Sequence, residues 1–333
     1  MKAIIPLAGK GTRLLPHTHV TPKPLMHVAG RPVMSYILDD IIDLGIHEVV
    51  FVVGYLRESI EAYVDDAYPQ ITANYVFQDI QDGTAGAVAL AEPFIDGEVL
   101  ILFVDTISDA DLARVQNVDN NTGGVIWVKE VEDYQRYGVI LTDENDHMVS
   151  IVEKPSEPVS NLANIGIYYI RDWQLLFEGI AHTLASEVGP SGEFYLTDAF
   201  QYMVDQGSKI QIVPVNGWYD CGNLEALIDT NRYLLEKDRA EVKDSAVVER
   251  SNIIEPVRIE SDAYVIDSTI GPNVTVGSGA RIEGSRLTDT MVGRDSIIEK
   301  SDLNNSLVGS KSEVRFSRGQ VSVVDDEELI GDQ

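Results

Sequence analysis

This sequence of 333 residues is poor in cysteine and in long apolar runs, and each scarcity excludes a class of protein. The single cysteine, Cys221, rules out a disulfide within the chain and agrees with a reducing compartment. No apolar run approaches the roughly 20 residues of a membrane-spanning helix, and the first apolar stretch is too short for a secretory signal. We therefore expect a cytoplasmic protein that binds no membrane.

Basic residues are also scarce, with 25 Lys and Arg against 54 Asp and Glu and a formal net charge of −29. Nucleic-acid backbones require clustered cations, so this balance argues against a nucleic-acid partner. We interpret the excess as a solvated acidic surface, and an acidic docking face for a basic partner is the alternative. Only ten residues are lysine, and three of them, Lys10, Lys23 and Lys154, lie in the motifs described below.

The first two thirds of the chain alternate between strand-like and helix-like patterns. Strands are predicted at 3–7, 49–53, 72–77, 100–104, 125–129, 138–141, 150–153 and 166–170, and helices at 32–44, 57–64, 84–92, 196–204 and 224–235. Such alternation is typical of a mostly parallel sheet covered by helices. Ligands of these sheets bind beyond the carboxyl ends of the strands. This rule predicts that the loop after Leu7, the loop 78–86 and Asp105 lie along one edge.

After a charged stretch at 236–244 the apolar residues recur in steps of five or six. They are Val247, Ile253, Ile259, Val265, Ile270, Val276, Ile282, Leu287, Val292, Ile298, Leu303, Val308 and Val314. An α-helix has no such period, and a plain strand repeats every two residues. With Gly271, Gly277, Gly293 and Gly309 beside these positions, the pattern predicts a parallel β-helix of about four coils. Antiparallel strands separated by turns are the alternative.

The opening segment, "MKAIIPLAGKGTRLLPHTHVTPKP", joins a strand to a glycine turn, an arginine and a lysine between two prolines. Leu14 stands where a dinucleotide-binding fingerprint needs its third glycine, and the spacing of a Walker P-loop is also missing. A glycine turn after a strand still exposes backbone N–H groups to phosphate, and Arg13 adds a planar fork of donors. Pro22 and Pro24 stiffen the backbone at Lys23, which favours an electrostatic clamp over an ordinary surface lysine.

Two aspartates are candidate ligands of Mg²⁺, which binds one or two carboxylates together with substrate phosphates. Asp105 follows the apolar run "VLILFV", and Asp220 lies between aromatic residues and a glycine turn in "GWYDCGN". For Asp105 the alternative is a turn-forming role. For Asp220 the alternative is the N-cap of the helix that begins near Asn223.

Taken together, the motifs resemble those of the sugar-1-phosphate nucleotidylyltransferases. Besides G-x-G-T-R and P-K-P, the chain contains in order "QDIQDGTAGAV", "LFVDT", "YGVI", "VEKP", "NIGIYYI", "EFYLTDA" and "WYDCGN". The resemblance covers nearly the whole chain and is greatest to the glucose-1-phosphate thymidylyltransferase and uridylyltransferase branch with a C-terminal left-handed β-helix. It implies an α/β fold, with a Rossmann-like catalytic domain of mixed, mostly parallel sheet at 1–236 and a left-handed parallel β-helix at 237–333.

The resemblance also implies roles for individual residues. Toward the nucleotide these are Leu7, Ala8, Gly9, Gly11, Thr12, Gln78, Gly83 and Thr84, with the Gln78 amide reading the edge of uracil or thymine. Arg13 would contact the NTP phosphates and Lys23 would stabilise the charge of the transition state. Gly138, Glu153, Lys154, Asn164 and Tyr168 would hold the sugar phosphate, the glutamate on sugar hydroxyls and the lysine on the phosphate. Asp105 and Asp220 match the two metal-binding carboxylates.

The implied reaction transfers a nucleotidyl group from dTTP or UTP to a hexose 1-phosphate, glucose 1-phosphate above all, with Mg²⁺ as cofactor in a homo-oligomer. Three alternatives stay open. A mannose-1-phosphate guanylyltransferase shares the "DGTAGAV" loop, although Gln78 argues against it. A bifunctional enzyme would transfer acetyl groups on the β-helix, although all six histidines precede that domain and the usual general base is missing. A non-catalytic nucleotide-sugar sensor is disfavoured because Lys23, Asp105 and Asp220 are all present.

Overall fold

A computed structural model describes residues 1–188 and 192–331 and divides the chain into two compact units. The first unit contains Met1–Lys10 and Ile37–Trp218, and the second contains Gly11–Tyr36 and Tyr219–Gln333. Segment 11–36 thus packs with the C-terminal part of the chain. Helix α1 (Val33–Asp43) and strand β13 (Trp218–Asp220) run across the division. The predicted domain boundary between residues 236 and 237 stays a prediction.

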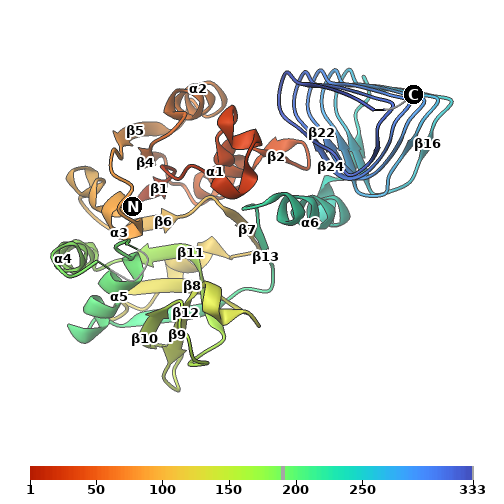
Figure 1. Cartoon of the computed structure of the whole chain (residues 1–333). Coiled ribbons are helices and arrows are strands. Elements are labelled where there is room, and N and C mark those ends of the chain that lie inside the picture. The colour runs from red at the N-terminus through yellow and green to blue at the C-terminus, as the bar shows by residue number, and fades with distance from the viewer. Residues whose placement is uncertain (189–191, 332–333) are drawn as a thin grey trace. The chain divides into compact units, whose positions relative to one another are not determined.

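A nine-stranded mixed sheet organises the first unit (Figure 1). Its strands follow the order β10-β9-β11-β6-β1-β4-β5, with β8 paired to β11 and β12 paired to β8. Their bounds are β1 (Lys2–Pro6), β4 (Glu48–Val53), β5 (Thr72–Phe77), β6 (Val99–Leu102), β8 (Gly124–Glu130), β9 (Gly138–Thr142), β10 (Met148–Glu153), β11 (Leu162–Ile170) and β12 (Ile210–Pro214). Strand β7 (Thr106–Ser108) lies outside this sheet.

Parallel pairing brings the predicted ligand-binding loops to one edge of this sheet. Strand β1 pairs in parallel with β4 and β6, and β4 pairs in parallel with β5. Their carboxyl ends therefore share an edge, as the sequence predicted. Strand β6 ends at Leu102, so Asp105 lies in a turn three residues beyond the strand instead of at its last position.

The helices of the first unit are α2 (Arg57–Ala67), α3 (Thr84–Ala89), α4 (Trp173–Leu184) and α5 (Leu196–Asp205), with 3-10 turns at Glu92–Phe94, Leu112–Asn117 and Tyr134–Arg136. The last three of these helices bury apolar faces in one core. Helices α3, α4 and α5 pack against one another, and Phe177, Phe200 and Ile4 share the same core cluster. The sequence analysis missed α4 and β12. Helix α4 carries apolar residues at a helical spacing, Leu176, Phe177 and Ile180, that could have revealed it.

The second unit is a parallel β-helix accompanied by α6 (Leu224–Leu234), a π-helical turn at Leu235–Arg239 and segment 11–36. Segment 11–36 contains 3-10 turns at Thr12–Leu14, His17–His19 and Lys23–Leu25 and the hairpin β2 (His27–Val28) and β3 (Arg31–Pro32). The β-helix strands are β14 (Glu241–Val242), β15 (Val247–Glu249), β16 (Asn252–Ile253), β17 (Val257–Ile259), β18 (Tyr264–Ile266), β19 (Thr269–Ile270), β20 (Val274–Val276), β21 (Arg281–Glu283), β22 (Arg286–Val292), β23 (Ile297–Glu299), β24 (Asp302–Val308), β25 (Glu313–Arg315), β26 (Arg318–Gly319), β27 (Ser322–Val323) and β28 (Glu328–Ile330).

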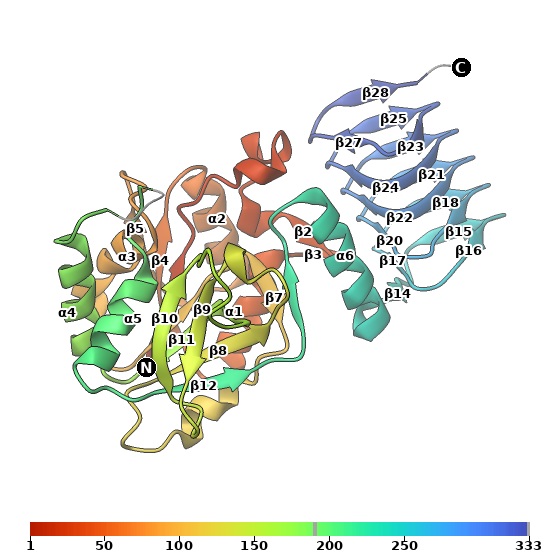
Figure 2. The same ribbon diagram turned by 60° about the horizontal axis from the view of Figure 1, so that its bottom comes forward.

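All strand pairings of the β-helix are parallel, so the alternative of antiparallel strands separated by turns is wrong. The parallel arrangement is consistent with the left-handed β-helix that the sequence predicted. Figure 2 shows the rungs stacked from β15 to β28. One side contains six strands, β15-β18-β21-β23-β25-β28, where the period predicted about four coils. One coil contains 16 or 17 residues, because Tyr264 pairs with Arg281, 17 residues later in the sequence, and Arg281 pairs with Ile297, 16 residues later.

The apolar residues of the predicted period fill the β-helix. Eleven of the thirteen positions, from Ile259 to Val314, belong to its buried core, and Ile253 packs against that core. Val247 was placed one residue too early, because Val248 contacts the core instead. Within the described parts of the chain, no helix has the length and apolar character required to cross a membrane.

Candidate nucleotide and sugar-phosphate site

The loop after β1 begins buried and then opens. The Leu7 N–H donates to the Val52 carbonyl at 2.7 Å, and the Ala8 carbonyl accepts a bond of 2.8 Å from Gln81 Nε2. Both Leu7 and Ala8 are 4% exposed. At Gly9 an added Cβ would meet no atom within 4 Å. The chain is therefore fixed up to Ala8 and leaves open space around Gly9, where a ligand could approach the backbone.

The loop between β5 and α3 is held by its own side chains. Gln78 is 6% exposed, and its Nε2 donates to Asp82 Oδ1 at 3.1 Å. Gly83 has φ 118°, and a Cβ there would lie 2.3 Å from the Phe194 carbonyl oxygen, so only glycine fits. Thr84 Oγ1 accepts a bond of 2.9 Å from the Leu196 N–H. These contacts tie the predicted base-reading loop to the segment before α5.

Four of the residues predicted to hold the sugar phosphate meet around Gly138. A Cβ on Gly138 would lie 2.5 Å from Asn164 Nδ2 and 2.7 Å from Glu153 Oε2. Asn164 Nδ2 donates to the Gly138 carbonyl at 2.9 Å, and the Tyr168 hydroxyl donates to Asn164 Oδ1. Strands β9, β10 and β11 are adjacent in the sheet, which explains this convergence of residues far apart in the sequence. The cluster offers hydrogen-bond acceptors and donors of the kind that hexose hydroxyls need.

Burial controls the electrostatics of this cluster. It raises the pKa of Glu153, against the opposing influence of the Lys154 charge and of the hydrogen bond from Thr197. Burial also raises the pKa of Tyr168, and the negative charges of Glu153 and Asp105 act in the same direction. Tyr168 stays a neutral hydrogen-bond donor throughout the physiological range.

Lys154, the fifth predicted residue, borders the same cluster. Its Nζ is 3.9 Å from Glu153 Oε1 and 5.1 Å from the centroid of the Tyr195 ring. Thr197 Oγ1 donates to Glu153 Oε2 at 3.3 Å. Sequence reasoning assigned no role to Tyr195 or Thr197, although both lie in the quoted motif "EFYLTDA". That motif was the only available signal, because the contacts join segments that are distant along the chain.

In the second unit the structure packs Gly11 against Lys23. Gly11 has φ 62°, and a Cβ there would lie 3.1 Å from Lys23 Cβ and 3.1 Å from Thr18 Cγ2. The Thr18 hydroxyl donates to the Gly11 carbonyl at 3.0 Å. Lys23 follows Pro22 and begins a 3-10 turn whose second residue is Pro24. The stiff backbone predicted for Lys23 is thus joined to the glycine turn, and Thr12 begins the next turn.

The second unit also brings Arg13 and Asp220 to one glycine. A Cβ on Gly222 would lie 2.7 Å from Arg13 Nη2 and 2.7 Å from Asp220 Oδ1. The Gly222 N–H donates to Asp220 Oδ1 at 2.7 Å. Asp220 is not the N-cap of α6, because the Asn223 side chain accepts the bond from the Ala226 N–H. Gly222, which sequence reasoning missed, leaves room for the guanidinium and the carboxylate.

A divalent cation fits the chemistry of the predicted donors. In residues 1–188 and 192–331 no group of three or more His, Cys, Asp or Glu could hold a metal ion. Mg²⁺ in nucleotide sites needs no such group, because substrate phosphates complete its octahedral shell of oxygens. Asp220 Oδ1 has one short bond, to Gly222 N, and a carboxylate has about four lone-pair positions.

In sequence the chain is similar to known nucleotidyl transferases. The profile of a family described as "Nucleotidyl transferase" matches residues 2–237. The chain is 30% identical over 322 residues to a glucose-1-phosphate thymidylyltransferase of Streptomyces antibioticus, covering 90% of this chain and 88% of that protein. It is 33% identical over 224 residues to the UTP–glucose-1-phosphate uridylyltransferase AglF of Haloferax volcanii, covering 66% of this chain and 89% of that protein.

Two further likenesses are partial. The chain is 34% identical over 260 residues to a bifunctional protein GlmU of Methanocaldococcus jannaschii, covering 77% of this chain but only 60% of that protein's length. A solved structure of a UDP-glucose pyrophosphorylase complexed with UDP-glucose gives a TM-score of 0.63 at 24% identity, covering 71% of this chain and 98% of that one. At this identity the second likeness concerns the fold alone.

Proposed function

Because the chain belongs to the nucleotidyl transferase family, we propose that it acts on a sugar 1-phosphate. More narrowly, it transfers a nucleotidyl group from UTP or dTTP to glucose 1-phosphate, giving a nucleotide sugar and pyrophosphate. The observation that supports this most is the cluster of Glu153, Asn164 and Tyr168 around Gly138, beside Lys154. It combines partners for sugar hydroxyls with a cation for a phosphate.

In the proposed reaction a phosphate oxygen of the hexose 1-phosphate attacks the α-phosphorus of the nucleotide in line. The new oxygen–phosphorus bond forms as the bond to the bridging oxygen breaks, and pyrophosphate leaves with that oxygen. The protein supplies positioning and charge, which are the main sources of catalysis in phosphoryl-type transfers. Arg13 binds the nucleotide phosphates, Lys23 stabilises the transition-state charge, and Lys154 holds the sugar phosphate.

Asp105 and Asp220 are proposed as the carboxylates that hold Mg²⁺. When bound, the cation neutralises charge on the phosphates. Arg13, which lies beside Asp220 at Gly222, would then donate to phosphate oxygens next to the bound cation.

Acetyl transfer is not part of the proposal, although a bifunctional relative exists. All six histidines precede residue 183, so residues 237–333 contain no imidazole to act as a general base. Guanylyl transfer is disfavoured because the buried Gln78 amide suits the N3–H and carbonyl edge shared by uracil and thymine. A sensor without turnover would have no need of Lys23 and the two aspartates.

The proposal is tested by pyrophosphate release from UTP, dTTP, GTP, ATP and CTP with glucose 1-phosphate, galactose 1-phosphate and mannose 1-phosphate. Release with UTP or dTTP and glucose 1-phosphate is expected. Lys23→Ala should lower kcat about 10²–10³-fold, the scale for loss of one preorganised charge, while Lys209→Ala, at an exposed lysine, should not. Turnover with GTP and mannose 1-phosphate alone, or none with any pair, would overturn the proposal.

A further inference from the structure

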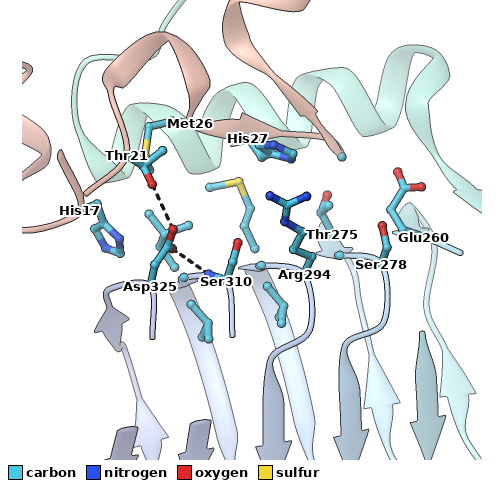
Figure 3. Close-up of a pocket in the computed structure, with 18 of the residues that line it drawn as sticks. His17, Thr21, Met26, His27, Glu260, Thr275, Ser278, Arg294, Ser310 and Asp325 are labelled. Atoms are coloured by element: carbon cyan, nitrogen blue, oxygen red, sulfur yellow. Dashed lines mark hydrogen bonds between the residues drawn. The ribbon is translucent and has the colours of Figure 1, made fainter. Parts of the chain in front are cut away.

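A cavity of about 160 Å³ lies within the second unit, between segment 11–36 and the β-helix (Figure 3). Segment 11–36 contributes His17, Thr21, Met26 and His27 to its lining. The β-helix contributes successive coils, which end at the cavity in Glu260, Ser278, Arg294, Ser310 and Asp325. A cavity of about 150 Å³ accommodates a benzene ring, so this one has room for a compact group such as phosphate.

Arg294 interrupts a column of small residues on the β-helix. The Asp295 N–H donates to the Ser278 carbonyl at 2.9 Å, the Lys311 N–H to the Arg294 carbonyl at 2.8 Å and the Asp326 N–H to the Ser310 carbonyl at 2.9 Å. Positions 278, 294 and 310 are therefore stacked in neighbouring coils. Serine occupies the coils before and after, so neither the turn nor the stacking requires an arginine at 294. The glycines beside this column are explained separately, because a Cβ on Gly293 would lie 2.5 Å from the Ser310 nitrogen of the next coil.

The Arg294 guanidinium has no hydrogen bond or ion pair with any residue in the described parts of the chain. Two carboxylates line the same cavity, yet each binds another group. Glu260 is paired with Arg258. Asp325 accepts bonds of 2.7 Å from the Ser310 N–H and 3.0 Å from the Thr21 hydroxyl. In a chain with 54 acidic residues against 25 basic ones, an arginine that projects into a cavity without an acidic partner is conspicuous.

His27 faces Arg294 from the opposite wall (Figure 3). The His27 ring projects into the cavity, so solvent reaches it although protein atoms surround the cavity on several sides. Burial among these atoms lowers the pKa of His27, and the Arg294 charge lowers it further. Asp325, Glu260 and a backbone hydrogen bond with Gly30 act in the opposite direction. An anion bound between the Arg294 guanidinium and the His27 imidazole would offset the repulsion between their positive charges.

We propose that this cavity binds a phosphate group, held by the Arg294 fork and by protonated His27, with the Ser278 and Ser310 hydroxyls as further donors. Arginine presents planar donors that match phosphate oxygens, and charge-assisted bonds of this kind are about twice as strong as neutral ones. The inference goes beyond the proposed reaction and does not rest on it, because none of these residues belongs to the predicted catalytic set. The ligand is a free phosphate ion or the phosphate group of a small metabolite.

Such a ligand would join the β-helix to segment 11–36, the segment that contains Arg13 and Lys23. When the ligand binds at a pH above the pKa of His27, the His27 ring takes up a proton. The affinity for the ligand should therefore rise as the pH falls toward that pKa. Sulfate is a suitable probe of this effect, because it remains a dianion where phosphate titrates. The NMR signal of the His27 ring distinguishes an anion bound in this cavity from an anion bound in the catalytic site.

The test is an NMR titration of the six histidine rings with sulfate, inorganic phosphate and glucose 1-phosphate, the His27 signal being assigned by its loss in His27→Gln. In the wild type each bound anion should raise the pH midpoint of His27. Arg294→Ser, which restores the residue of the neighbouring coils, should weaken the response at least about tenfold, the scale for loss of a charge-assisted bond. A stronger response to glucose 1-phosphate than to phosphate identifies a phosphorylated metabolite as the ligand, and the reverse identifies the free ion.

Arg286→Ser is the matched control, since Arg286 is an exposed arginine of the same β-helix that does not line the cavity. It should leave the His27 response unchanged. An equal response in wild type and Arg294→Ser, or no response in the wild type to any of the three anions, would overturn the proposal. Both outcomes are independent of pyrophosphate release, so failure here leaves the proposed reaction untouched.

Discussion

The Gln78 side chain uses part of its hydrogen-bonding capacity within its own loop. Its amide nitrogen donates to Asp82 Oδ1 at 3.1 Å, and Asp82 in turn lies over Gly86, where a Cβ would be 2.0 Å from the carboxylate. An amide group offers two donors and an acceptor oxygen. One N–H and the Oε1 oxygen therefore stay suited to the carbonyl and N3–H of a pyrimidine. The bond to Asp82 would orient them.

We expect Gln78→Ala to reduce the preference for UTP and dTTP over GTP, ATP and CTP by about 1–3 kcal/mol, the cost of a buried polar partner left unsatisfied. The measurement is kcat/KM for the five nucleotides. Gln81→Ala is the matched comparison, because Gln81 lies in the same loop but donates to the Ala8 carbonyl. An unchanged rank order in Gln78→Ala, with all nucleotides slowed alike, would mean that Gln78 only braces the loop.

Asp105 and Asp220 should act together if they hold one Mg²⁺. Asp105→Asn and Asp220→Asn are each expected to abolish Mg²⁺-dependent pyrophosphate release. The double variant should be little worse than either single one, because groups that act as a unit are not additive. Asp109→Asn, four residues beyond Asp105, is the control and should retain activity. Fully multiplicative losses in the double variant would refute a shared ion.

The raised pKa of Glu153 has a consequence for stability. Burial is its main cause, so the ionised Glu153 carboxylate destabilises the folded chain. This destabilisation is complete above the raised pKa and disappears below the ordinary glutamate pKa of about 4.3. Glu153→Gln should therefore raise the free energy of unfolding at pH 7, and the gain should shrink as the pH falls toward 4.3. The same variant should raise KM for the hexose 1-phosphate.

Urea unfolding at several pH values measures this effect. Glu157→Gln, at an exposed position four residues on, should change neither stability nor KM. If Glu153→Gln were less stable than wild type at pH 7, the contacts with Thr197 and Lys154 would outweigh burial, and the assigned direction of the pKa shift would be wrong.

At the scale of elements, a ladder of buried serines fixes one corner of the β-helix. The Ser285 N–H donates to Ser268 Oγ at 3.0 Å, the Ser301 N–H to Ser285 Oγ at 3.1 Å and the Ser317 N–H to Ser301 Oγ at 3.1 Å. Each hydroxyl thus receives the N–H of the next coil. The apolar period predicted the interior of these coils, but it contained no information about this corner.

Ser285→Ala should lower the free energy of unfolding by about 1–3 kcal/mol, because it leaves the buried Ser301 N–H without an acceptor. The measurement is urea unfolding of the full chain. Ser261→Ala is the control, since the Ser261 hydroxyl makes no hydrogen bond within the described residues, and it should change stability by less than about 0.5 kcal/mol. Equal effects of the two substitutions would show that the ladder adds nothing to stability.

At the scale of the whole molecule, patterns within short stretches of sequence predicted most of the individual strands and helices and the coils of the β-helix. Hydrophobic period and strand–helix alternation gave the sheet and the β-helix, and the family motifs gave the residues around Gly138. They could not reveal that segment 11–36 packs with the β-helix, because the contacts join residues about 300 positions apart, such as His17 with Ser322 at 2.7 Å. Thr197 and Gly222 were missed because Glu153 and Arg13, the residues beside them, are also distant along the chain. The compartment and the homo-oligomeric state stay predictions, since neither follows from the packing of one chain.

Asn231 of α6 is the centre of the contacts that hold segment 11–36. It is 1% exposed, and its Oδ1 accepts bonds of 3.0 Å from the Ala29 N–H and 2.7 Å from the Thr275 hydroxyl. Its Nδ2 donates to the Asn273 carbonyl at 3.2 Å. One side chain thereby joins the β2–β3 turn and α6 to Thr275 of strand β20 and to Asn273, the residue before that strand. The β-helix is thus a support for the segment that contains both predicted catalytic cations.

Asn231→Ala should loosen this support. It leaves the Ala29 N–H and the Thr275 hydroxyl buried without their partner, so we expect the free energy of unfolding to fall by about 2–6 kcal/mol, at about 1–3 kcal/mol for each of the two unsatisfied groups. Hydrogen exchange at residues 27–30 should become faster, and kcat for pyrophosphate release should fall although no predicted site residue is changed. Asn305→Ala is the matched control, because Asn305 also contacts α6 but through an exposed bond of 2.9 Å from Arg232. It should alter exchange and kcat little. Faster exchange without any loss of kcat would mean that Arg13 and Lys23 do not depend on the β-helix for their positions.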